Sequence, residues 1–322
     1  MAGAQELAAS DEYPRGFPPS RHDALMHHSD TRVTRWVKMA ALAEVVLVFA
    51  LLHVTYRAIK HFTTWGRLED SLGLNLTPGL AMIAFTLAVV LLHRRALSGY
   101  GLTLADWRRH VSLALSSILV AAVVAGPPLL LLSRYYDPRW APSATPAIVG
   151  TLANLGAALL FLVVMRRDRP VVIGWPPIAT LPLVAVIAAS PILISMCRQK
   201  AIEPALAEAL WLFVGAGVGE EVFFRGYVQS HVDLAFGRPR SVWGTRLGPG
   251  IVVAAALFGI IHVLNPVDYF HGRLDFAWWW FPTAFASGLV QGCVRARAGS
   301  VLPCAIIHAL GDIVGTLPRW LG

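Results

Sequence analysis

Three short segments in the C-terminal third of the chain combine ionisable side chains with apolar neighbours. They are EEVFFR (Glu220, Glu221 and Arg225), FGIIH (Phe258 and His262) and HALGD (His308 and Asp312). A carboxylate and a histidine held together can orient a water molecule, remove a proton from it and return that proton to a leaving group. These residue types can carry acid–base chemistry, provided that the fold brings the three segments together.

Helical spacing predicts which of these side chains share a face. Glu221 and Arg225 are four residues apart, so they can form a charge-assisted pair on one face of a helix. Glu220 is turned about 100° away from Glu221 by the helical period, which leaves it free to act as a base. The same four-residue spacing joins two further pairs, Phe258 with His262 and His308 with Asp312. Three helices would then each present a polar face to one site.

The surroundings of these charges are those of a membrane protein. Hydrophobic residues make up 56% of the 322 residues and charged residues only 14%, which lies outside the range of ordinary soluble domains. A charged group deep in a bilayer costs at least a few kcal/mol, so it is rarely found without a partner or a hydrated cavity. The first five apolar windows hold almost no such group, Glu44 being the exception, whereas the last four hold nearly all of them.

Apolar windows of about 18 to 20 residues, the length that crosses the hydrocarbon core, predict the helices. They lie at 39–57, 76–93, 111–132, 146–165, 178–197, 205–224, 249–265, 276–294 and 300–317. We therefore expect an all-α protein, a polytopic transmembrane helical bundle with about eight to nine spans. Its expected regions are a polar tail (1–38), N-terminal transmembrane helices (39–200) and a C-terminal core that carries the three segments (201–322).

Basic residues predict the orientation, because they gather before the first window and after the second, fourth, sixth and eighth. By the positive-inside bias, the N-terminus and these connections are cytoplasmic and the C-terminus lies outside. Glu220 would then lie close to the cytoplasmic face and His262 towards the outside. We therefore expect the sixth helix to run on to about Leu234, and the seventh to extend past Asn265, so that the two side chains can meet.

The three segments resemble the three motifs of a known family. E-E-x-x-x-R, F-x-x-x-H and H-x-x-x-D, in this order and on separate apolar segments, are similar to those of the CPBP intramembrane protease family. This family includes the type II CAAX prenyl endopeptidases and Abi-like, bacteriocin-processing proteins. The matching region runs from about Trp211 to Ile313, roughly a third of the chain.

The resemblance implies a role for each motif residue. Glu220 is taken to activate a water molecule for attack on a peptide carbonyl, with His262 holding that water. His308 and Asp312 would stabilise the oxyanion or orient the site. Other members carry asparagine at the last position, and an ionised aspartate offers only acceptors, so Asp312 suits orienting His308 or binding a metal. The motifs also contain supporting residues, which are Glu221, Arg225 and Phe258.

Metal dependence is left open by the sequence. Two histidines, His262 and His308, with Glu220 or Asp312 could form a zinc site with an open position for water. There is no H-E-x-x-H helix, however, and the ligands would have to come from three different helices. We therefore expect no cofactor and keep zinc as the alternative.

The sequence thus predicts a bacterial intramembrane endopeptidase that uses Glu220 to hydrolyse a peptide bond in a membrane-anchored protein or peptide. It is expected in the cytoplasmic (inner) membrane, with the bilayer and the substrate as its partners. Nucleic acid is not an expected partner, because the arginines lie in short clusters between apolar windows rather than along one polar face. The alternative is a non-catalytic scaffold or a proton- or ion-coupled transporter that uses the same ionisable cluster.

Overall fold

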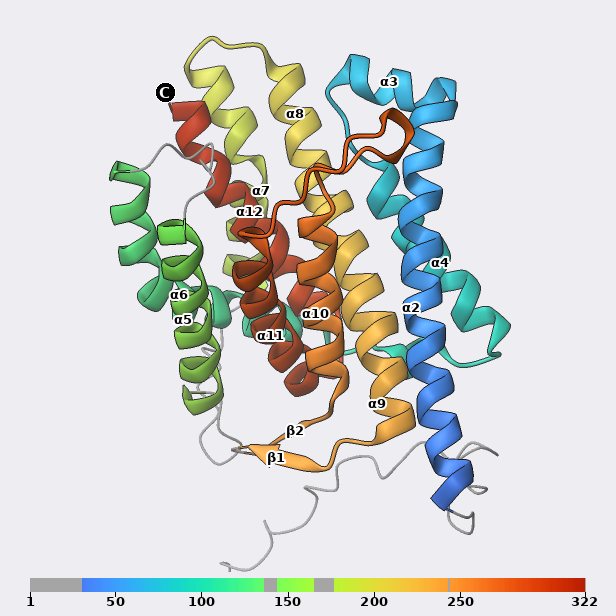
Figure 1. Ribbon diagram of the computed structural model, residues 1–322. Helices are drawn as coiled ribbons and strands as arrows, with labels where there is room; N and C mark the ends of the chain where they lie inside the picture. Colours follow the sequence, from blue (N-terminus) through green and yellow to red (C-terminus); the bar gives the residue numbers. More distant parts are fainter. Residues whose placement is uncertain (1–30, 136–143, 165–176, 243, 322) are drawn as a thin grey trace, which may run out of the picture.

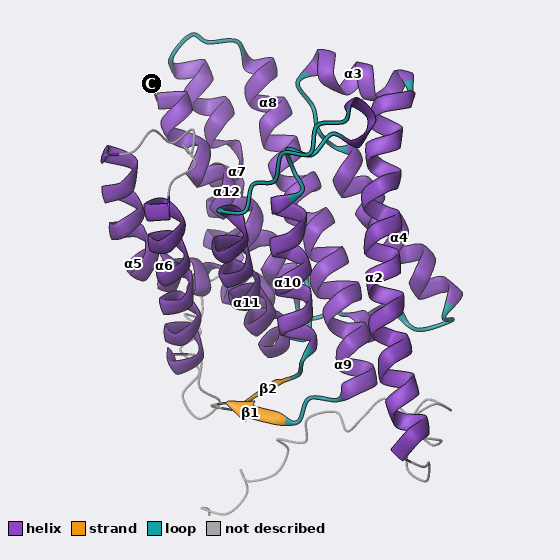
Figure 2. Ribbon diagram, in the orientation of Figure 1, coloured by secondary structure: helices purple, strands orange, loops and turns teal. Residues whose placement is uncertain are grey.

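The protein is a bundle of long helices (Figures 1 and 2). The computed structural model describes residues 31–135, 144–164, 177–242 and 244–321. Its elements are α2 (Thr31–Phe62), α3 (Thr64–Leu72), α4 (Thr77–Leu92), η1 (Leu97–Tyr100), α5 (Trp107–Tyr135), α6 (Ala144–Val164), α7 (Pro177–Cys197), α8 (Ile202–Leu210), η2 (Trp211–Glu220), η3 (Val222–Gln229), α9 (Ser230–Phe236), β1 (Arg240–Val242), β2 (Thr245–Leu247), α10 (Gly250–Val263), η4 (Tyr269–His271), α11 (Trp280–Ala298) and α12 (Leu302–Leu321). The predicted all-α bundle is confirmed, with one short antiparallel hairpin, β1–β2, that the sequence analysis did not foresee.

The helices have the length and composition of membrane spans. Four are long and apolar enough to cross a bilayer, within Thr34–Phe62, Trp107–Val124, Ala179–Cys197 and Ile202–Phe236. Shorter apolar helices cover Thr77–Leu92, Ile148–Val164, Gly250–Val263 and Leu302–Leu317. Large apolar side chains also face outwards, among them Leu92, Val123 and Leu159, which are 81%, 72% and 58% exposed. The chain is therefore an integral membrane protein, and every predicted window falls on a helix, while the number of spans remains a prediction.

One unbroken helix runs from Ile202 to Phe236, through α8, η2, η3 and α9. The predicted extension of the sixth helix beyond residue 224 is thus confirmed. Its middle, η2 and η3, is π-helical, so that backbone bonds there reach from residue i to i+5. Successive residues in such a helix are turned by less than the 100° of an α-helix, which brings the directions of Glu220 and Glu221 closer together.

The seventh helix does not extend past Asn265 as predicted. α10 ends at Val263, and Arg57 Nη2, from α2, donates to the carbonyl oxygens of Leu264 and Asn265 at 2.9 and 2.8 Å. A positive side chain suits the end of a helix, where carbonyl groups lack intrahelical partners. The end of α10 is therefore fixed by a residue 207 positions away, which no local pattern could indicate.

The N-terminal part also differs from the expectation. α2 begins at Thr31, inside the segment expected to be tail, while residues 1–30 lie outside the described part. The short helix α3 follows α2 and was not predicted, because it is brief and largely polar. Its Glu69 is buried and accepts bonds from Thr77 N and Oγ1 at 2.8 and 2.5 Å, which caps the beginning of α4.

Close helix approaches hold the central helix in place. A Cβ atom added to Gly79 in α4 would lie 2.5 Å from Cα of Gly215, and one added to Gly219 would lie 2.5 Å from Cα of Gly79. On another side of η2, a Cβ added to Gly217 would lie 2.6 Å from Cβ of Ala309 in α12. Small residues permit such approaches between membrane helices. The helix segment that carries Glu220 is thus clamped between α4 and α12.

Most of the described connections that carry basic residues lie at one end of the bundle. The beginning of α2, the end of α9 and the hairpin β1–β2 lie at the lower end in Figure 1. The turn after η1 joins the α11–α12 connection there, since Val301 N donates to Gly101 O at 3.0 Å and Ser300 Oγ to Thr103 O at 3.1 Å. The opposite end carries α3 and the connection from α10 to α11. Alternate connections therefore share one end, while its cytoplasmic side remains a prediction.

Candidate active site

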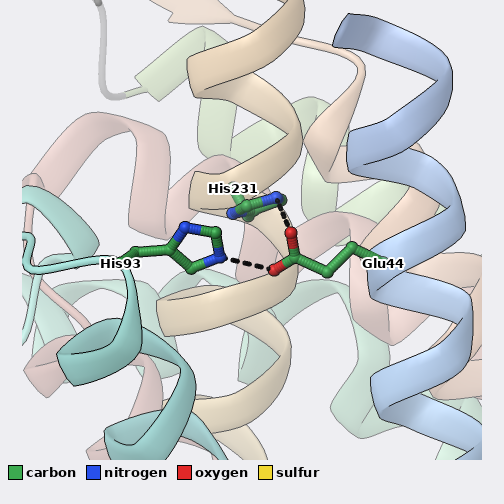
Figure 3. A group of neighbouring side chains, drawn as sticks. All are labelled: Glu44, His93 and His231. Atoms are coloured by element: carbon green, nitrogen blue, oxygen red, sulfur yellow. Dashed lines mark hydrogen bonds and ion pairs between the residues drawn. The ribbon is translucent and has the colours of Figure 1, made fainter.

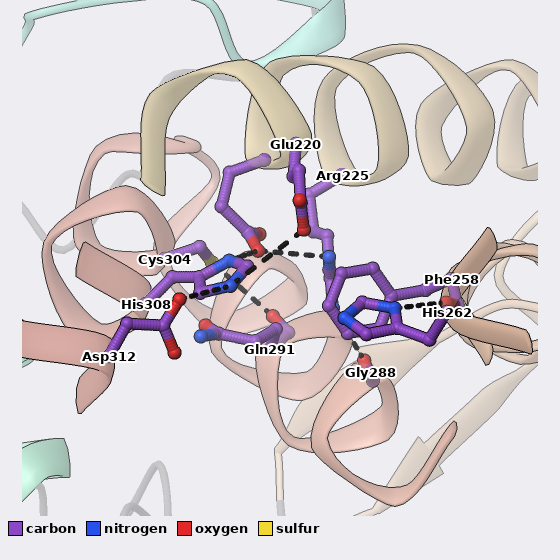
Figure 4. Close-up of polar contacts among 10 residues, drawn as sticks. Glu220, Arg225, Phe258, His262, Gly288, Gln291, Cys304, His308 and Asp312 are labelled. Atoms are coloured by element: carbon purple, nitrogen blue, oxygen red, sulfur yellow. Dashed lines mark hydrogen bonds and ion pairs between the residues drawn. The ribbon is translucent and has the colours of Figure 1, made fainter. Parts of the chain in front are cut away.

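The three predicted segments converge inside the bundle (Figure 4). Glu220 and Glu221 come from the junction of η2 and η3, Phe258 and His262 from α10, and His308 and Asp312 from α12. A fourth helix, α11, contributes Gly288 and Gln291, which the sequence analysis did not single out. The predicted meeting of three polar helix faces is therefore observed, with an added wall from α11.

The Glu221–Arg225 ion pair expected from the spacing is present. Arg225 Nη1 donates to Glu221 Oε1 at 2.9 Å, and both side chains are fully buried. Arg225 Nη2 also donates to Gly288 O at 3.4 Å, and its guanidinium carbon lies 4.6 Å from the centre of the Phe258 ring. A buried charge is tolerated only where partners replace its hydration. The arginine thus ties the π-helical segment to both α10 and α11.

His308 binds the glutamate pair in a way that the sequence did not indicate. Its Nδ1 lies 2.8 Å from Glu221 Oε1, so Glu221 is shared between Arg225 and His308. Its Nε2 lies 3.8 Å from Glu220 Oε2 and 3.4 Å from Asp312 Oδ2. A histidine can donate from both ring nitrogens only as the imidazolium. Three carboxylates around one ring therefore favour a positively charged His308 that faces Glu220.

Glu220 differs from Glu221 in having no hydrogen bond to either carboxylate oxygen within the described residues, whereas Oε1 of Glu221 has two partners. Its side chain is 14% exposed, and Oε2 is buried without a hydrogen-bond partner among the described residues. The distance of 3.8 Å to His308 Nε2 is too long for a hydrogen bond but short enough for electrostatic attraction. This carboxylate is thus held near a positive group while one oxygen stays available to a ligand such as water.

His262 lies beside Glu220, Glu221 and His308 rather than among them. Its Nδ1 donates to Phe258 O at 2.8 Å, so in the neutral ring Nε2 is the acceptor. Within the described residues it forms no hydrogen bond or ion pair with Glu220 or His308. The Phe258 ring contacts both histidines, with ring centres 4.6 Å from His262 and 5.7 Å from His308. His262 therefore has no direct hydrogen bond to the other two residues within the described part of the chain, and a link through one water molecule stays a prediction.

The connection after α10 covers this end of the site. Ala277 N donates to Val263 O at 3.0 Å, and the Trp280 ring meets His262 edge-on at 5.9 Å. Within the connection, hydrogen bonds from His271, together with one from Arg273, hold the pKa of Asp268 at about 2. This carboxylate stays ionised at physiological pH, so the contacts that order the connection persist.

The four motif residues do not form a compact set of metal ligands. Zinc bound to three protein ligands needs their donor atoms about 2 Å from one point. Among the described residues, the group whose ligand atoms all lie within 4.8 Å of one another comprises Glu44, His93 and His231, and none of the motif residues belongs to it. The expectation that the site uses no metal stays a prediction.

Comparisons with known proteins address the same part of the chain. Residues 202–314 match the family model described as type II CAAX prenyl endopeptidase Rce1-like. No curated protein and no solved structure gives a significant match to the chain. The matched segment begins at the first residue of α8 and includes all three motifs and α11. Residues 202–314 are therefore similar to the Rce1-like type II CAAX prenyl endopeptidases, in agreement with the resemblance of the three motifs.

Proposed function

We propose that this protein is an intramembrane endopeptidase that hydrolyses a peptide bond in a membrane-anchored protein. The family match supports the reaction class, and the family acts on membrane-anchored substrates. The observation that carries the proposal for this chain is the contrast within the glutamate pair. Oε1 of Glu221 binds Arg225 and His308, whereas neither oxygen of Glu220 has a hydrogen bond in the part of the chain described.

In the proposed reaction, Glu220 accepts a proton from a water molecule as the water oxygen attacks the peptide carbonyl carbon. The carbonyl oxygen becomes an oxyanion, and His308 stabilises it by donating from Nε2. Glu220 then returns the proton to the amide nitrogen as the carbon–nitrogen bond breaks. Water is consumed, one acid and one amine are formed, and Glu220 ends as the carboxylate with which it began.

The remaining residues position His308 and the attacking water molecule. Arg225 and Glu221 hold His308 against the π-helical segment, and Asp312 fixes its Nε2 side through a contact of 3.4 Å. His262 offers Nε2 as an acceptor, which suits a water molecule approaching from its side of the site. We propose that this mechanism needs no metal, because the motif residues do not form a group of three ligand atoms within 4.8 Å of one another among the described residues.

The test uses two defined peptides and the full chain in detergent or nanodiscs. One probe is a farnesylated peptide ending in a CAAX sequence, and the other is the same peptide without the farnesyl group. Wild-type protein should cleave at least one of them, while Glu220→Gln should not. Cleavage of both at equal rates would indicate that a lipid on the substrate is not recognised.

A search for the natural substrate completes the test. Terminal-peptide mass spectrometry of membranes from cells that express the wild-type protein should show new termini that are missing with Glu220→Gln. New termini that appear equally with both proteins would contradict the protease assignment. That result would favour a scaffold or an ion-coupled transporter.

A further inference from the structure

A second polar cluster lies outside the candidate active site. Glu44 of α2, His93 directly after α4 and His231 of α9 point towards one another (Figure 3). One ligand atom from each side chain lies within 4.8 Å of the others. The cluster joins two N-terminal helices to the helix that also carries Glu220, eleven residues before His231. None of its three residues takes part in the reaction proposed above.

Glu44 is the centre of the cluster. Its Oε1 lies 2.9 Å from His93 Nε2, and its Oε2 lies 3.4 Å from His231 Nε2. Both histidines therefore present the same ring nitrogen to one carboxylate. An isolated carboxylate among apolar membrane helices is costly, so these two contacts explain how α2 tolerates its acidic residue.

Two tyrosines hold the cluster from outside. Tyr227 donates its hydroxyl to Glu44 Oε1 at 2.9 Å, and the Tyr100 hydroxyl lies 3.5 Å from His231 Nδ1. Arg95 directs Nη1 at the Tyr100 hydroxyl, also at 3.5 Å, rather than at Glu44. Metal-binding histidines commonly use their second nitrogen in this way, because an outer partner fixes the tautomer and leaves the other lone pair facing the ion. Around His231, the Tyr100 hydroxyl stands in the place of such an outer partner.

We propose that Glu44, His93 and His231 bind a divalent cation of the zinc type. Two imidazole nitrogens and one carboxylate oxygen are donors that zinc prefers, and a water molecule would complete four-coordination. The three donor atoms already lie within 4.8 Å of one another, so small side-chain movements bring them to zinc distances of about 2.0 to 2.2 Å from one point. The ion replaces the protons that the histidines otherwise direct at Glu44. The result is a cross-link between α2, the connection after α4, and α9.

Two of the three side chains are partly exposed, so an ion can enter and leave the site. The side chains of His93 and Glu44 are 34% and 29% exposed, whereas that of His231 is only 6% exposed. His231 is therefore the fixed ligand, and His93, at the end of its helix, is the ligand best able to move. This site is separate from Glu220, and the proposal does not depend on the proposed protease activity.

The experiment measures Zn²⁺ binding to the purified, untagged full chain after removal of metal by a chelator. Titration calorimetry compares the wild-type protein with His93→Gln, which retains a donor for Glu44 but lacks the imidazole. We expect the wild-type protein to bind one more equivalent of Zn²⁺ than this variant. Zn²⁺ should also raise the Tm of the wild-type protein and leave that of His93→Gln unchanged.

Two further variants make the result specific. Tyr227→Phe removes only the hydroxyl that binds Glu44 and should weaken Zn²⁺ binding about 10- to 100-fold, as expected for an outer partner of a metal ligand. His271→Gln changes an exposed histidine in the connection after α10 and should bind Zn²⁺ as the wild type does. Co²⁺ bound to the wild-type protein should absorb visible light, so occupation of the site can also be measured without a variant.

Three outcomes would overturn the proposal. Equal Zn²⁺ binding by the wild type and His93→Gln would show that this cluster is not the site. Loss of binding in Glu220→Gln or His308→Gln, but not in His93→Gln, would locate the ion in the candidate active site. Absence of Zn²⁺ and Co²⁺ binding in the wild-type protein would leave Glu44 as the centre of a simple hydrogen-bonded cluster.

Discussion

At the scale of single residues, two adjacent glutamates have different surroundings. Glu221 is fully buried and its Oε1 contacts Arg225 and His308, whereas Glu220 forms no hydrogen bond with any described residue. Neutralising either residue removes one negative charge, but the consequences should differ. Loss of Glu221 disturbs a buried network, while loss of Glu220 removes the proposed base.

Glu220→Gln should therefore abolish catalysis without lowering stability. We expect kcat to fall by about 10²- to 10⁴-fold, the usual contribution of general acid–base catalysis. Cleavage of the peptide that the wild-type protein accepts, measured beside Tm in detergent, checks both parts. Glu203→Gln, at an exposed position in the same long helix, is the control and should retain full activity. A Glu220→Gln protein with most of the wild-type turnover would exclude the assignment.

Arg225→Ala should lower stability as well as activity. The change removes a buried partner of Glu221, and breaking one side of a buried ion pair costs about 3 to 5 kcal/mol. Tm and the yield of folded protein are the measurements, with the exposed Arg246→Ala as the control. The double variant Glu221→Gln with Arg225→Met should recover part of the loss, because no unpaired charge remains. An unchanged Tm in Arg225→Ala would show that the pair does not support the fold.

At the scale of elements, the π-helical segment and α12 have to stay close for the site to exist. Gly217 allows this contact, since the Cβ of any larger residue would meet Cβ of Ala309 at 2.6 Å and O of Ala305 at 3.1 Å. Ala309 follows His308 directly. A displacement of α12 at this point therefore moves the imidazole away from Glu220 and Glu221.

Gly217→Ala should reduce kcat/KM by about 10²-fold, the effect of misplacing a catalytic group by about an ångström. Gly311→Ala is the matched control, because nothing lies within 4 Å of the added Cβ in the same region of α12. Adding Ala309→Gly to Gly217→Ala should restore part of the activity by removing the atom that clashes. If Gly217→Ala retains full activity, the close approach of the two helices is not required.

At the scale of the whole molecule, the alternating distribution of basic connections predicts the orientation in the membrane. The described connections rich in arginine gather at the end that holds β1 and β2, as Figure 1 shows. By the positive-inside bias this end is cytoplasmic. The end of α7, at Cys197, belongs to the opposite end and should face the outside.

The chain itself supplies a probe for this orientation. Cys197 is exposed, whereas Cys293 and Cys304 are buried. A membrane-impermeant maleimide added to intact cells should therefore label the wild-type protein and not Cys197→Ser. Labelling of the wild-type protein in inside-out vesicles, but not in intact cells, would reverse the predicted orientation.

The sequence alone determined the helical class, the helix positions and the motif residues. Composition and apolar windows suffice for these, because the bilayer accepts few spanning structures and each window covers one helix. Spacing also predicted the Glu221–Arg225 pair, since residues four apart on a helix are neighbours whatever the rest of the fold. The family resemblance followed from these residues and agrees with the match over residues 202–314.

Only the tertiary structure decided which motif residues meet. His308 bridges Glu221 and Glu220 because a π-helical segment turns both carboxylates towards α12, and periodicity alone predicts an ordinary α-helix there. Phe258 separates His262 from His308, although both lie on correctly predicted helices. The cluster of Glu44, His93 and His231 joins positions up to 187 residues apart. Such contacts depend on how helices pack across the bundle, and no local spacing in the chain encodes that packing.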